Sequence, residues 1–454
     1  VSKGEILGLV GESGSGKSTV GNAIINLIDE PGKVSNGTIH LGDINIYENS
    51  ENIAKYRGKK IGLIFQDPQT SLNPIFTIGE QLIETIQTHL KLNNEQAKVK
   101  AINLLKEVGI KDAEERFYNY PHQFSGGMRQ RVVISLALCC EPELLIADEP
   151  TTALDVSIQS QILDLIKKLT QERNLAVILI THDMGVIAET TDRVAVMKNG
   201  HLVEIGSTKK ILTEPKETYT KSLVSSVPPT NKKITRFIII EKENQPNQNK
   251  NIKILNRWTK KDIIKQDLVE VKKLFKSFDD NFFTETSKNI VMAVEDVSFN
   301  IMEGETFGLV GESGSGKSTI AKMIVNLFKP SSGDIYFDKT CITKIKKNSE
   351  MMKFRKQIQM IFQDPYSSLN GRLKVEDIIA EPIKLHNPSI KNIDLKNYIF
   401  DLLESVELST SSATRYPHEF SGGQRQRISI ARALATQPRL LVCNEPTSAL
   451  DVSI

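Results

Sequence analysis

Two identical glycine-rich stretches contain the residues with the clearest chemistry in this sequence. Residues 8–19 read GLVGESGSGKST, and the same letters recur at residues 308–319. Glycines at these spacings let the backbone curl until successive N–H groups converge on phosphate oxygens, and a helix that follows adds the positive end of its dipole. One such motif can arise by chance, but two verbatim copies in matching context argue strongly against chance.

Each stretch also carries a lysine and hydroxyl groups at positions suited to a nucleotide. We expect Lys17 and Lys317 to reach the β- and γ-phosphates, and the hydroxyls of Ser18 and Ser318 to ligate Mg²⁺. The other candidate binding residues of the two loops are the glycines and the final threonines, namely Gly11, Gly14, Gly16, Thr19, Gly311, Gly314, Gly316 and Thr319.

The flanking residues supply the elements that must position these loops. Each loop follows an apolar run, at residues 5–10 and 305–310, and precedes an amphipathic run, at residues 20–28 and 320–328. The sequence therefore predicts a strand, a phosphate loop and a helix in both copies.

Polar residues end three further apolar runs in the first half. Gln66 ends the run that starts at residue 61, Asp148 and Glu149 end LLIADE at residues 144–149, and His182 follows AVILIT at residues 176–181. Continuous apolar runs suit buried parallel strands, whose carboxyl ends hold ligands. A glutamine there is either a solvated cap or a ligand that carries its amide oxygen to Mg²⁺ and the attacking water.

Each of these polar ends has a plainer alternative. Asp148 and Glu149 could form a solvated turn, and His182 could have a structural role. The order of the motifs favours chemistry instead. Asp148 would hold Mg²⁺ through its water shell, and Glu149 would accept the proton from, or orient, the water that attacks the γ-phosphate. His182 would sense that phosphate.

A second anion site is predicted between these strands. In PHQFSGGMRQR, at residues 121–131, Ser125 is placed to cap a helix, and Gly126 and Gly127 allow close approach of its N–H groups. A simple helix start is the alternative.

Helical periodicity over residues 75–115 predicts a helical insert, and we expect its apolar stripes to be core rather than a binding face. Asp155 follows in a tight loop before a predicted helix at residues 156–169.

The bulk composition fits soluble globular domains. The chain has 454 residues, 39% hydrophobic and 25% charged, and its repeat predicts two domains of one kind. A net charge of +3 is too small to argue for nucleic acid. No apolar run reaches membrane-spanning length. The four cysteines show no CxxC spacing, so we expect core packing and weakly favour the cytoplasm. The chain starts without methionine and stops within a motif, so we interpret it as a fragment.

In this order, the motifs resemble the nucleotide-binding domain of the ATP-binding cassette (ABC) family. The second half repeats the pattern at Gln363, Ser421, Gly422, Gly423, Asn444, Glu445 and Asp451. The resemblance implies ATP and Mg²⁺ as cofactors, and two domains that pair head to tail around two ATP molecules. It would place Ser421 and Gly423 opposite the first site, which consists of Lys17, Gln66, Asp148, Glu149 and His182. It would likewise place Ser125 and Gly127 opposite the second site, which consists of Lys317, Gln363 and Glu445.

Finer features resemble the peptide and nickel importer branch of ABC ATPases. They are YPHQFSGGMRQR and YPHEFSGGQRQR around the two SGG segments, DPQTSLNP and DPYSSLN after the two glutamines, and the extension at residues 214–229. The tandem arrangement resembles the single-chain ATPase of glutathione-type importers. The resemblance implies an ATP-hydrolysing subunit on the cytoplasmic face of the cell membrane. Its partners would be two membrane-spanning permease subunits and, indirectly, an extracytoplasmic substrate-binding protein, with no nucleic acid.

Two other classes of protein fit the sequence less well. A soluble twin-ABC ATPase acting on ribosomes or nucleic acid usually has a long charged helical linker or zinc-binding cysteines, and the sequence shows neither. A regulatory protein that binds ATP without hydrolysing it is disfavoured by the intact first site. The sequence does not identify the transported solute.

We therefore predict two tandem α/β P-loop domains, each with a mostly parallel sheet and a helical insert. The first spans residues 1–229 and lacks its N-terminal strand, and an Asn/Lys-rich linker spans residues 230–266. The second spans residues 267–454 and is truncated before its terminal histidine. The linker is expected to be a solvated tether, with a nucleic-acid or lipid contact as the alternative. Phe278 is expected to stack on adenine, with Phe275 as the alternative.

One departure from the repeat has a chemical consequence. Asn444 stands where the first half has Asp148, which removes one negative charge from the expected Mg²⁺ site and leaves a neutral acceptor. Glu445 is retained. We expect the second site to bind ATP but to turn it over more slowly than the first.

Overall fold

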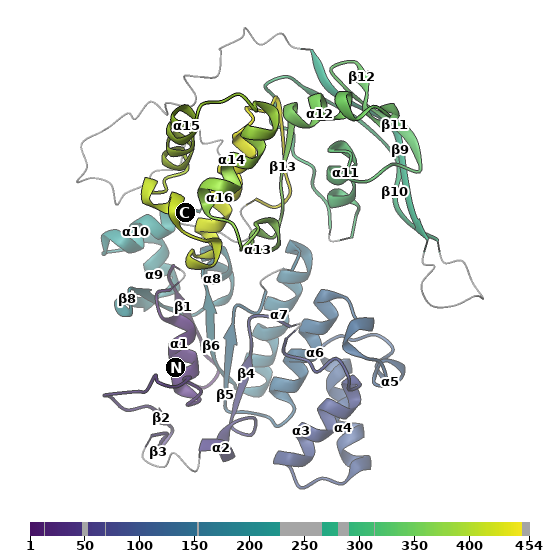
Figure 1. Ribbon diagram of the computed structural model, residues 1–454. Helices are drawn as coiled ribbons and strands as arrows, with labels where there is room; N and C mark the ends of the chain where they lie inside the picture. Colours follow the sequence, from purple (N-terminus) through teal and green to yellow (C-terminus); the bar gives the residue numbers. More distant parts are fainter. Residues whose placement is uncertain are drawn as a thin grey trace. The chain divides into compact units, whose positions relative to one another are not determined.

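The computed structural model describes residues 1–12, 14–47, 53–68, 70–151, 154–227, 266–279, 290–312 and 314–446 (Figure 1). The contacts between Cα atoms divide the chain into two units between Pro246 and Asn247. This boundary falls inside the predicted linker, whose residues 230–265 lie outside the described part of the chain.

A sheet with strand order β4-β5-β6-β1-β7-β8 forms the centre of the first unit. Neighbouring strands are parallel except β7 and β8, which are antiparallel. Every residue of β6 is buried, as the continuous apolar run predicts for a strand covered on both faces. The strands are β1 (Ile6–Val10), β4 (Ile61–Ile64), β5 (Leu144–Asp148), β6 (Ala176–Thr181), β7 (Arg193–Lys198) and β8 (His201–Ser207). The predicted mostly parallel α/β fold is confirmed in this unit.

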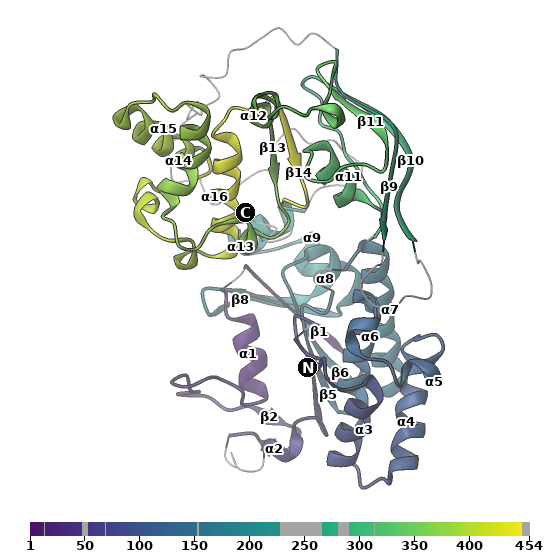
Figure 2. The ribbon, with the colours of Figure 1, turned by 45° about the vertical axis from the view of Figure 1, so that its right-hand side comes forward.

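The helices of the first unit cover this sheet and form a lobe at one side of it (Figures 1 and 2). The covering helices are α1 (Lys17–Ile24), α2 (Ile53–Tyr56), α6 (Gly126–Leu138), α7 (Val156–Arg173), α8 (Met184–Thr190), α9 (Thr208–Thr213) and α10 (Thr218–Ser225). Short elements complete the unit: the hairpin β2 (His40–Leu41) and β3 (Ile44–Asn45), and the 3₁₀ turn η2 (Pro121–Gln123).

The lobe is the helical insert that the periodicity predicts. It consists of α3 (Ile78–His89), α4 (Asn94–Glu107) and α5 (Ala113–Arg116), and capping boxes at Thr77 and Asn93 fix the starts of α3 and α4. Leu82 and Leu105 are fully buried in the same hydrophobic cluster. The apolar stripes are therefore core, as expected.

The second unit contains two separate sheets among its described residues. One is antiparallel, with order β10-β9-β11-β12, and the other is the parallel pair β13-β14. The strands are β9 (Asp267–Asp279), β10 (Ile290–Met302), β11 (Ser332–Phe337), β12 (Thr340–Cys341), β13 (Ile358–Ile361) and β14 (Leu440–Cys443). Of the predicted parallel sheet, the described residues thus show this one pair.

The helices of this unit repeat the arrangement of the first. The helix α11 (Lys317–Ile324) packs into the core of the antiparallel sheet, where Ile320 and Met323 are buried with Val271 and Ile335. A helical lobe lies beside α16 (Figure 2). The helices and 3₁₀ turns after α11 are η4 (Ile342–Lys344), α12 (Asn348–Gln357), α13 (Pro365–Ser368), α14 (Val375–His386), α15 (Asn392–Ser405), η5 (Thr410–Thr414), η6 (Pro417–Glu419) and α16 (Gly422–Leu434).

The strand predicted at residues 305–310 is absent from the second unit. Residues 305–312 form no regular element, and Val310 is 89% exposed, whereas Val10 is fully buried. The reason lies in the pairing of β1, which hydrogen-bonds to β6 on one side and β7 on the other. Among the described residues of the second unit, no strand takes the place of β6 or β7, so residues 305–310 have no partners to pair with.

The helices that follow the phosphate loops end earlier than their amphipathic patterns suggest. The patterns extend to residues 28 and 328, but α1 ends at Ile24 and α11 at Ile324. Asn26 and Asn326 then adopt left-handed backbones, with φ of 52° and 56°. A left-handed residue just past the last turn stops a helix, and asparagine tolerates that conformation better than most residues.

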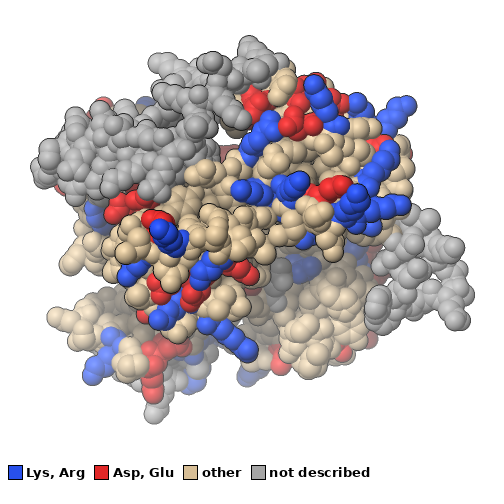
Figure 3. All heavy atoms as spheres, turned by 45° about the horizontal axis from the view of Figure 1, so that its top comes forward, with Lys and Arg blue, Asp and Glu red and all other residues tan. Residues whose placement is uncertain are grey.

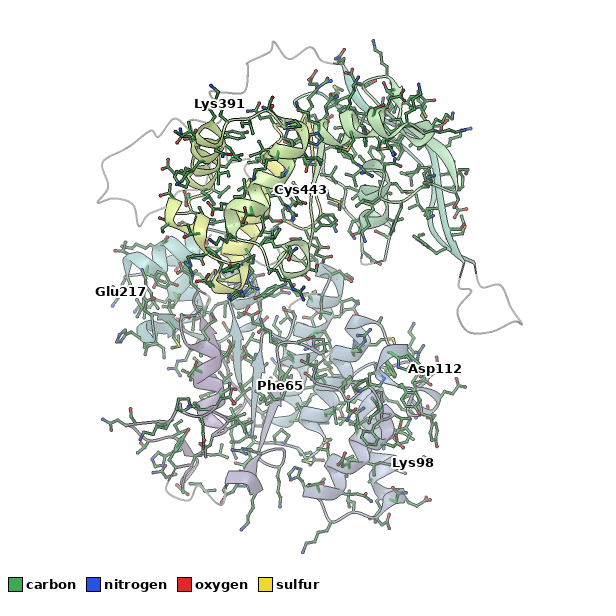
Figure 4. The ribbon with its side chains drawn as sticks, in the orientation of Figure 1. Phe65, Lys98, Asp112, Glu217, Lys391 and Cys443 are labelled. Carbon is green, nitrogen blue, oxygen red and sulfur yellow. The ribbon has the colours of Figure 1, made fainter. Side chains whose placement is uncertain are left out.

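The cysteines follow the core-packing prediction only in part. Cys139 and Cys140 are buried in the core of the first unit. Cys443, labelled in Figure 4, is exposed at the end of β14, and for this residue the prediction is wrong. In the described residues β14 pairs only with β13, whereas β5 of the first unit pairs with both β4 and β6.

The described surface carries mixed charge. On the face drawn in Figure 3, Lys and Arg side chains lie among Asp and Glu side chains. In the part of the chain that the structure describes, no helix combines the length and the apolar character needed to cross a bilayer.

Candidate active site

The first phosphate loop is a tight turn between β1 and α1. A Cβ atom on Gly11 would lie 2.2 Å from the carbonyl oxygen of Met197, so only glycine fits there. Gly14 and Gly16 have φ of 79° and 94°, in the left-handed region. The loop therefore needs its glycines for both space and backbone conformation.

Lys17 folds back over this loop. Its ammonium donates to the carbonyl oxygens of Gly11 at 2.7 Å and Glu12 at 2.8 Å, and the residue is only 6% exposed. Ser18 and Thr19 follow in the first turn of α1, where backbone N–H groups have no partner within the helix. A cation and free N–H donors thus converge at one helix start, which is what a polyphosphate requires.

The second loop has the same local geometry. The Lys317 ammonium donates to the carbonyl oxygens of Gly311 and Glu312, each at 2.7 Å. Gly314 and Gly316 have φ of 81° and 90°, and Ser318 and Thr319 open α11. The loop keeps this shape although the strand before it is not formed, so the twelve-residue motif itself determines the turn.

The carboxyl edge of the first sheet gathers three of the predicted catalytic side chains. The Glu149 carboxylate accepts a hydrogen bond from Gln66 Nε2 at 2.9 Å, and its other oxygen lies 2.8 Å from His182 Nδ1. Each of these residues comes just after its strand, and the parallel register of β4, β5 and β6 aligns the three strand ends. The expected convergence of Gln66, Glu149 and His182 is thus present in the structure.

Both candidate catalytic glutamates have a strained backbone. Glu149 and Glu445 each have φ of 48°, in the left-handed region that costs a residue with a side chain about 1 kcal/mol or more. In the first unit the Glu149 N–H is held by the Ile180 carbonyl at 2.9 Å, so the sheet imposes the conformation. Strain of this kind is typical of functional residues, and sequence periodicity alone did not reveal it.

Asp148 is suited to hold a cation beside the loop. Burial raises the pKa of its carboxyl and the Glu149 charge adds to this, while a hydrogen bond from Ser18 and the charge of Lys17 act in the opposite direction. Its Oδ1 atom is buried without a hydrogen-bond partner among the described residues. A buried acceptor of this kind is costly unless a donor or a cation satisfies it. Ser18, Gln66 and Asp148 therefore fit Mg²⁺, which would neutralise phosphate charge when bound.

The corresponding residues of the second unit keep the arrangement with one chemical change. Ser318 Oγ donates to Asn444 Oδ1 at 3.0 Å, and Gln363 Nε2 donates to Glu445 Oε2 at 2.5 Å. An amide therefore occupies the place of the Asp148 carboxylate. Gln363 thus holds Glu445 as Gln66 holds Glu149.

The two SGG segments begin helices as predicted. Ser125 caps α6 by accepting from Met128 N–H at 3.4 Å, and Ser421 caps α16 by accepting from Gln424 N–H at 3.3 Å. Gly126 and Gly422 are the first residues of these helices, and Gly423 is buried. A Cβ atom on Gly127 would lie 2.6 Å from Ile158, so this glycine allows α6 to approach α7.

The structure bears differently on the remaining predicted nucleotide-binding residues. The Asp155 carboxylate caps α7 by accepting from Ile158 N–H at 3.0 Å. Phe278 is 40% exposed, with its ring edge-to-face with Phe328 at 5.8 Å, and Phe275 is half-buried, so the structure leaves the choice of adenine contact open. Asp451 lies outside the described residues.

Comparison with known proteins identifies the family. The family model described as ABC transporter matches residues 1–152 and 294–448. The chain belongs to the ABC transporter family. A second model, described as oligopeptide/dipeptide transporter, C-terminal region, matches residues 203–253, which include the extension at residues 214–229.

Relatives that align with the whole of this chain agree with these family models. The ABC chain is 43% identical over 470 residues to the glutathione import ATP-binding protein GsiA of Escherichia coli (strain K12), an alignment that covers 100% of this chain and 74% of that protein. It is 42% identical over 477 residues to the protein of the same name in Pectobacterium atrosepticum, with the same coverage. The predictions of an ATP-binding, ATP-hydrolysing protein of the peptide importer branch are confirmed.

The geometry of this ABC ATPase leads to a prediction for His182. Because its ring holds one oxygen of Glu149, we expect His182→Ala to lower ATP turnover at the first site by about a hundredfold or more. Nucleotide should still bind, because Lys17 and the loop are unchanged. ATP hydrolysis and nucleotide binding would be measured in a Glu445→Gln background, with His201→Ala as the control because His201 is exposed on β8. Turnover at the level of the control would contradict the role of His182.

Proposed function

We propose that this ABC ATPase powers the import of peptides or a related small solute such as glutathione. The observation that carries the proposal is one chain with two phosphate-loop sites and the C-terminal region of oligopeptide/dipeptide transporters at residues 203–253. The names of its relatives, glutathione import proteins, support the solute class. The alternative of a soluble ATPase acting on ribosomes or nucleic acid receives no support from these relatives.

The proposed partners follow from the same family membership. The ATPase would bind two membrane-spanning permease subunits at the cytoplasmic face of the cell membrane, as a peripheral protein. An extracytoplasmic substrate-binding protein would deliver the solute to the permeases. Solute specificity would then reside in these partners rather than in the ATPase.

We further propose that the two units bind two ATP molecules between them, head to tail. Ser421 and Gly423 would complete the site of Lys17, and Ser125 and Gly127 would complete the site of Lys317. Support comes from the starts of α6 and α16, where the first N–H groups have no carbonyl partner within the helix and offer each nucleotide a second helix terminus.

An uptake experiment tests the proposed solute class. The full-length protein would be reconstituted in proteoliposomes with its permeases and substrate-binding protein, and uptake of labelled glutathione, a dipeptide and an oligopeptide would be compared. We expect ATP-dependent uptake of at least one of them, lost in Glu149→Gln. ATP hydrolysis without stimulation or uptake by any of these solutes would contradict the proposed class.

We also propose that Asn444 weakens Mg²⁺ binding at the second site. Its Oδ1 accepts the Ser318 hydroxyl, so the other end of the amide is an NH₂ group, which can only donate. In the first site the Asp148 carboxylate presents a buried acceptor, Oδ1, in addition to its contact with Ser18. The exchange thus replaces an acceptor with a donor and removes a negative charge, and both changes disfavour a cation.

Reciprocal substitutions test this difference between the two sites. A Lys17→Ala background leaves the second loop as the intact site, and Lys317→Ala leaves the first. We expect Asn444→Asp to lower, and Asp148→Asn to raise, the Mg²⁺ concentration needed for half-maximal binding of a fluorescent ATP analogue. Each shift should be about 10- to 100-fold, as for other groups that support a bound metal. Unchanged Mg²⁺ dependence in both variants would contradict the proposal.

A further inference from the structure

Two short helices near the end of the first unit pack against the strand that leads into its phosphate loop. After β8, the helices α9 and α10 bury Ile211, Tyr219 and Leu223 in one cluster with Val10 and Val196. Val10 is the last residue of β1, directly before the loop. The extension is thus packed behind the nucleotide site rather than held apart from it.

The start of α10 is fixed to the neighbouring strand. The Glu204 carboxylate on β8 accepts the N–H groups of Lys216 at 3.0 Å and Glu217 at 3.2 Å. Burial opposes the charge on Glu204, but these backbone donors outweigh it and lower the pKa of the carboxyl. Glu217, labelled in Figure 4, directly precedes α10. The carboxylate therefore stays ionised at neutral pH and anchors the helix.

The anchored helix places Tyr219 against the loop. Tyr219 is only 6% exposed, and its hydroxyl oxygen accepts a hydrogen bond from the Glu12 N–H at 3.1 Å. The Lys198 ammonium lies 4.5 Å from the centroid of the tyrosine ring. Ring packing and the hydroxyl contact together define where the Glu12 peptide sits.

That peptide is part of the cradle of Lys17. The Glu12 N–H shares its peptide group with the Gly11 carbonyl, which accepts from the Lys17 ammonium at 2.7 Å, and the Glu12 carbonyl is the second acceptor of that ammonium. On the far side of the loop, the Gly200 N–H donates to the Ser15 carbonyl at 3.1 Å. The loop is therefore held from behind at two points, by the β7–β8 turn and by Tyr219.

We propose that Tyr219 is a positioning residue for ATP binding at the first site. It acts through the Gly11–Glu12 peptide group, which it holds in the geometry that supports Lys17. The importer-type extension thereby contributes directly to the nucleotide site. This inference rests on ATP binding by the first loop, and it does not depend on which solute is imported.

The variant Tyr219→Phe tests the proposal, because it removes the hydroxyl and keeps the buried ring. Binding of a fluorescent ATP analogue would be measured in the full-length protein with Lys317→Ala, so that the first loop is the intact site. We expect binding to weaken by about three- to tenfold, the effect of losing one hydrogen bond. The KM for ATP should rise with little change in kcat, and the melting temperature without nucleotide should fall by no more than the loss of one hydrogen bond implies, about 2 to 4 °C.

Tyr47, which contacts the helix that follows the loop, provides a matched control. The Tyr47 hydroxyl donates to the Ala23 carbonyl at 2.6 Å, near the end of α1 and away from the loop, so Tyr47→Phe makes the same chemical change elsewhere. Unchanged affinity in Tyr219→Phe, or an equal loss in both variants, would overturn the proposal. So would a fall in melting temperature clearly larger than that of Tyr47→Phe, because it would indicate a packing role only.

Discussion

The parallel register of β4, β5, β6 and β1 is the constraint on which the first site depends. In this register Ala147 lies opposite Ile64 and Leu179, and Val10 lies opposite Thr181. The residues just after these strands are therefore brought to one edge of the sheet: Gln66, the pair Asp148 and Glu149, His182, and the phosphate loop. Residues scattered over more than a hundred positions form one site because the strands end in line.

The same constraint explains how much could be predicted from the sequence. The loops, the buried strands and their polar ends are encoded locally, by glycine spacing and by apolar runs, so they were predicted at their correct places. The strand predicted at residues 305–310 is not formed, because a strand needs partners, and the described part of the second unit has no strands in the places of β6 and β7, which pair with β1 in the first unit. The left-handed backbone at Glu149 also depends on a neighbouring strand and has no local signal. Tyr219 was missed for a similar reason, since its partner is 207 positions away.

The repeat provides an internal comparison between two sites of nearly identical sequence. Loop geometry, the lysine contacts, the glutamine–glutamate pair and the strained glutamate backbone recur in both units. Against this shared background, the change from Asp148 to Asn444 is confined to one position, and its effect on a cation follows from charge and donor–acceptor chemistry alone. The chain thus carries one site with the full set of acidic groups and one with a reduced set.

We propose that hydrolysis depends mainly on the site of Glu149 and less on that of Glu445. Steady-state ATP hydrolysis by the full-length protein, reconstituted with its permease subunits, would be compared for Glu149→Gln and Glu445→Gln. We expect turnover to be abolished in the first variant and to remain substantial in the second. Equal loss in both would show that Asn444 leaves its site fully competent, and full activity in both would contradict the assignment of the two glutamates.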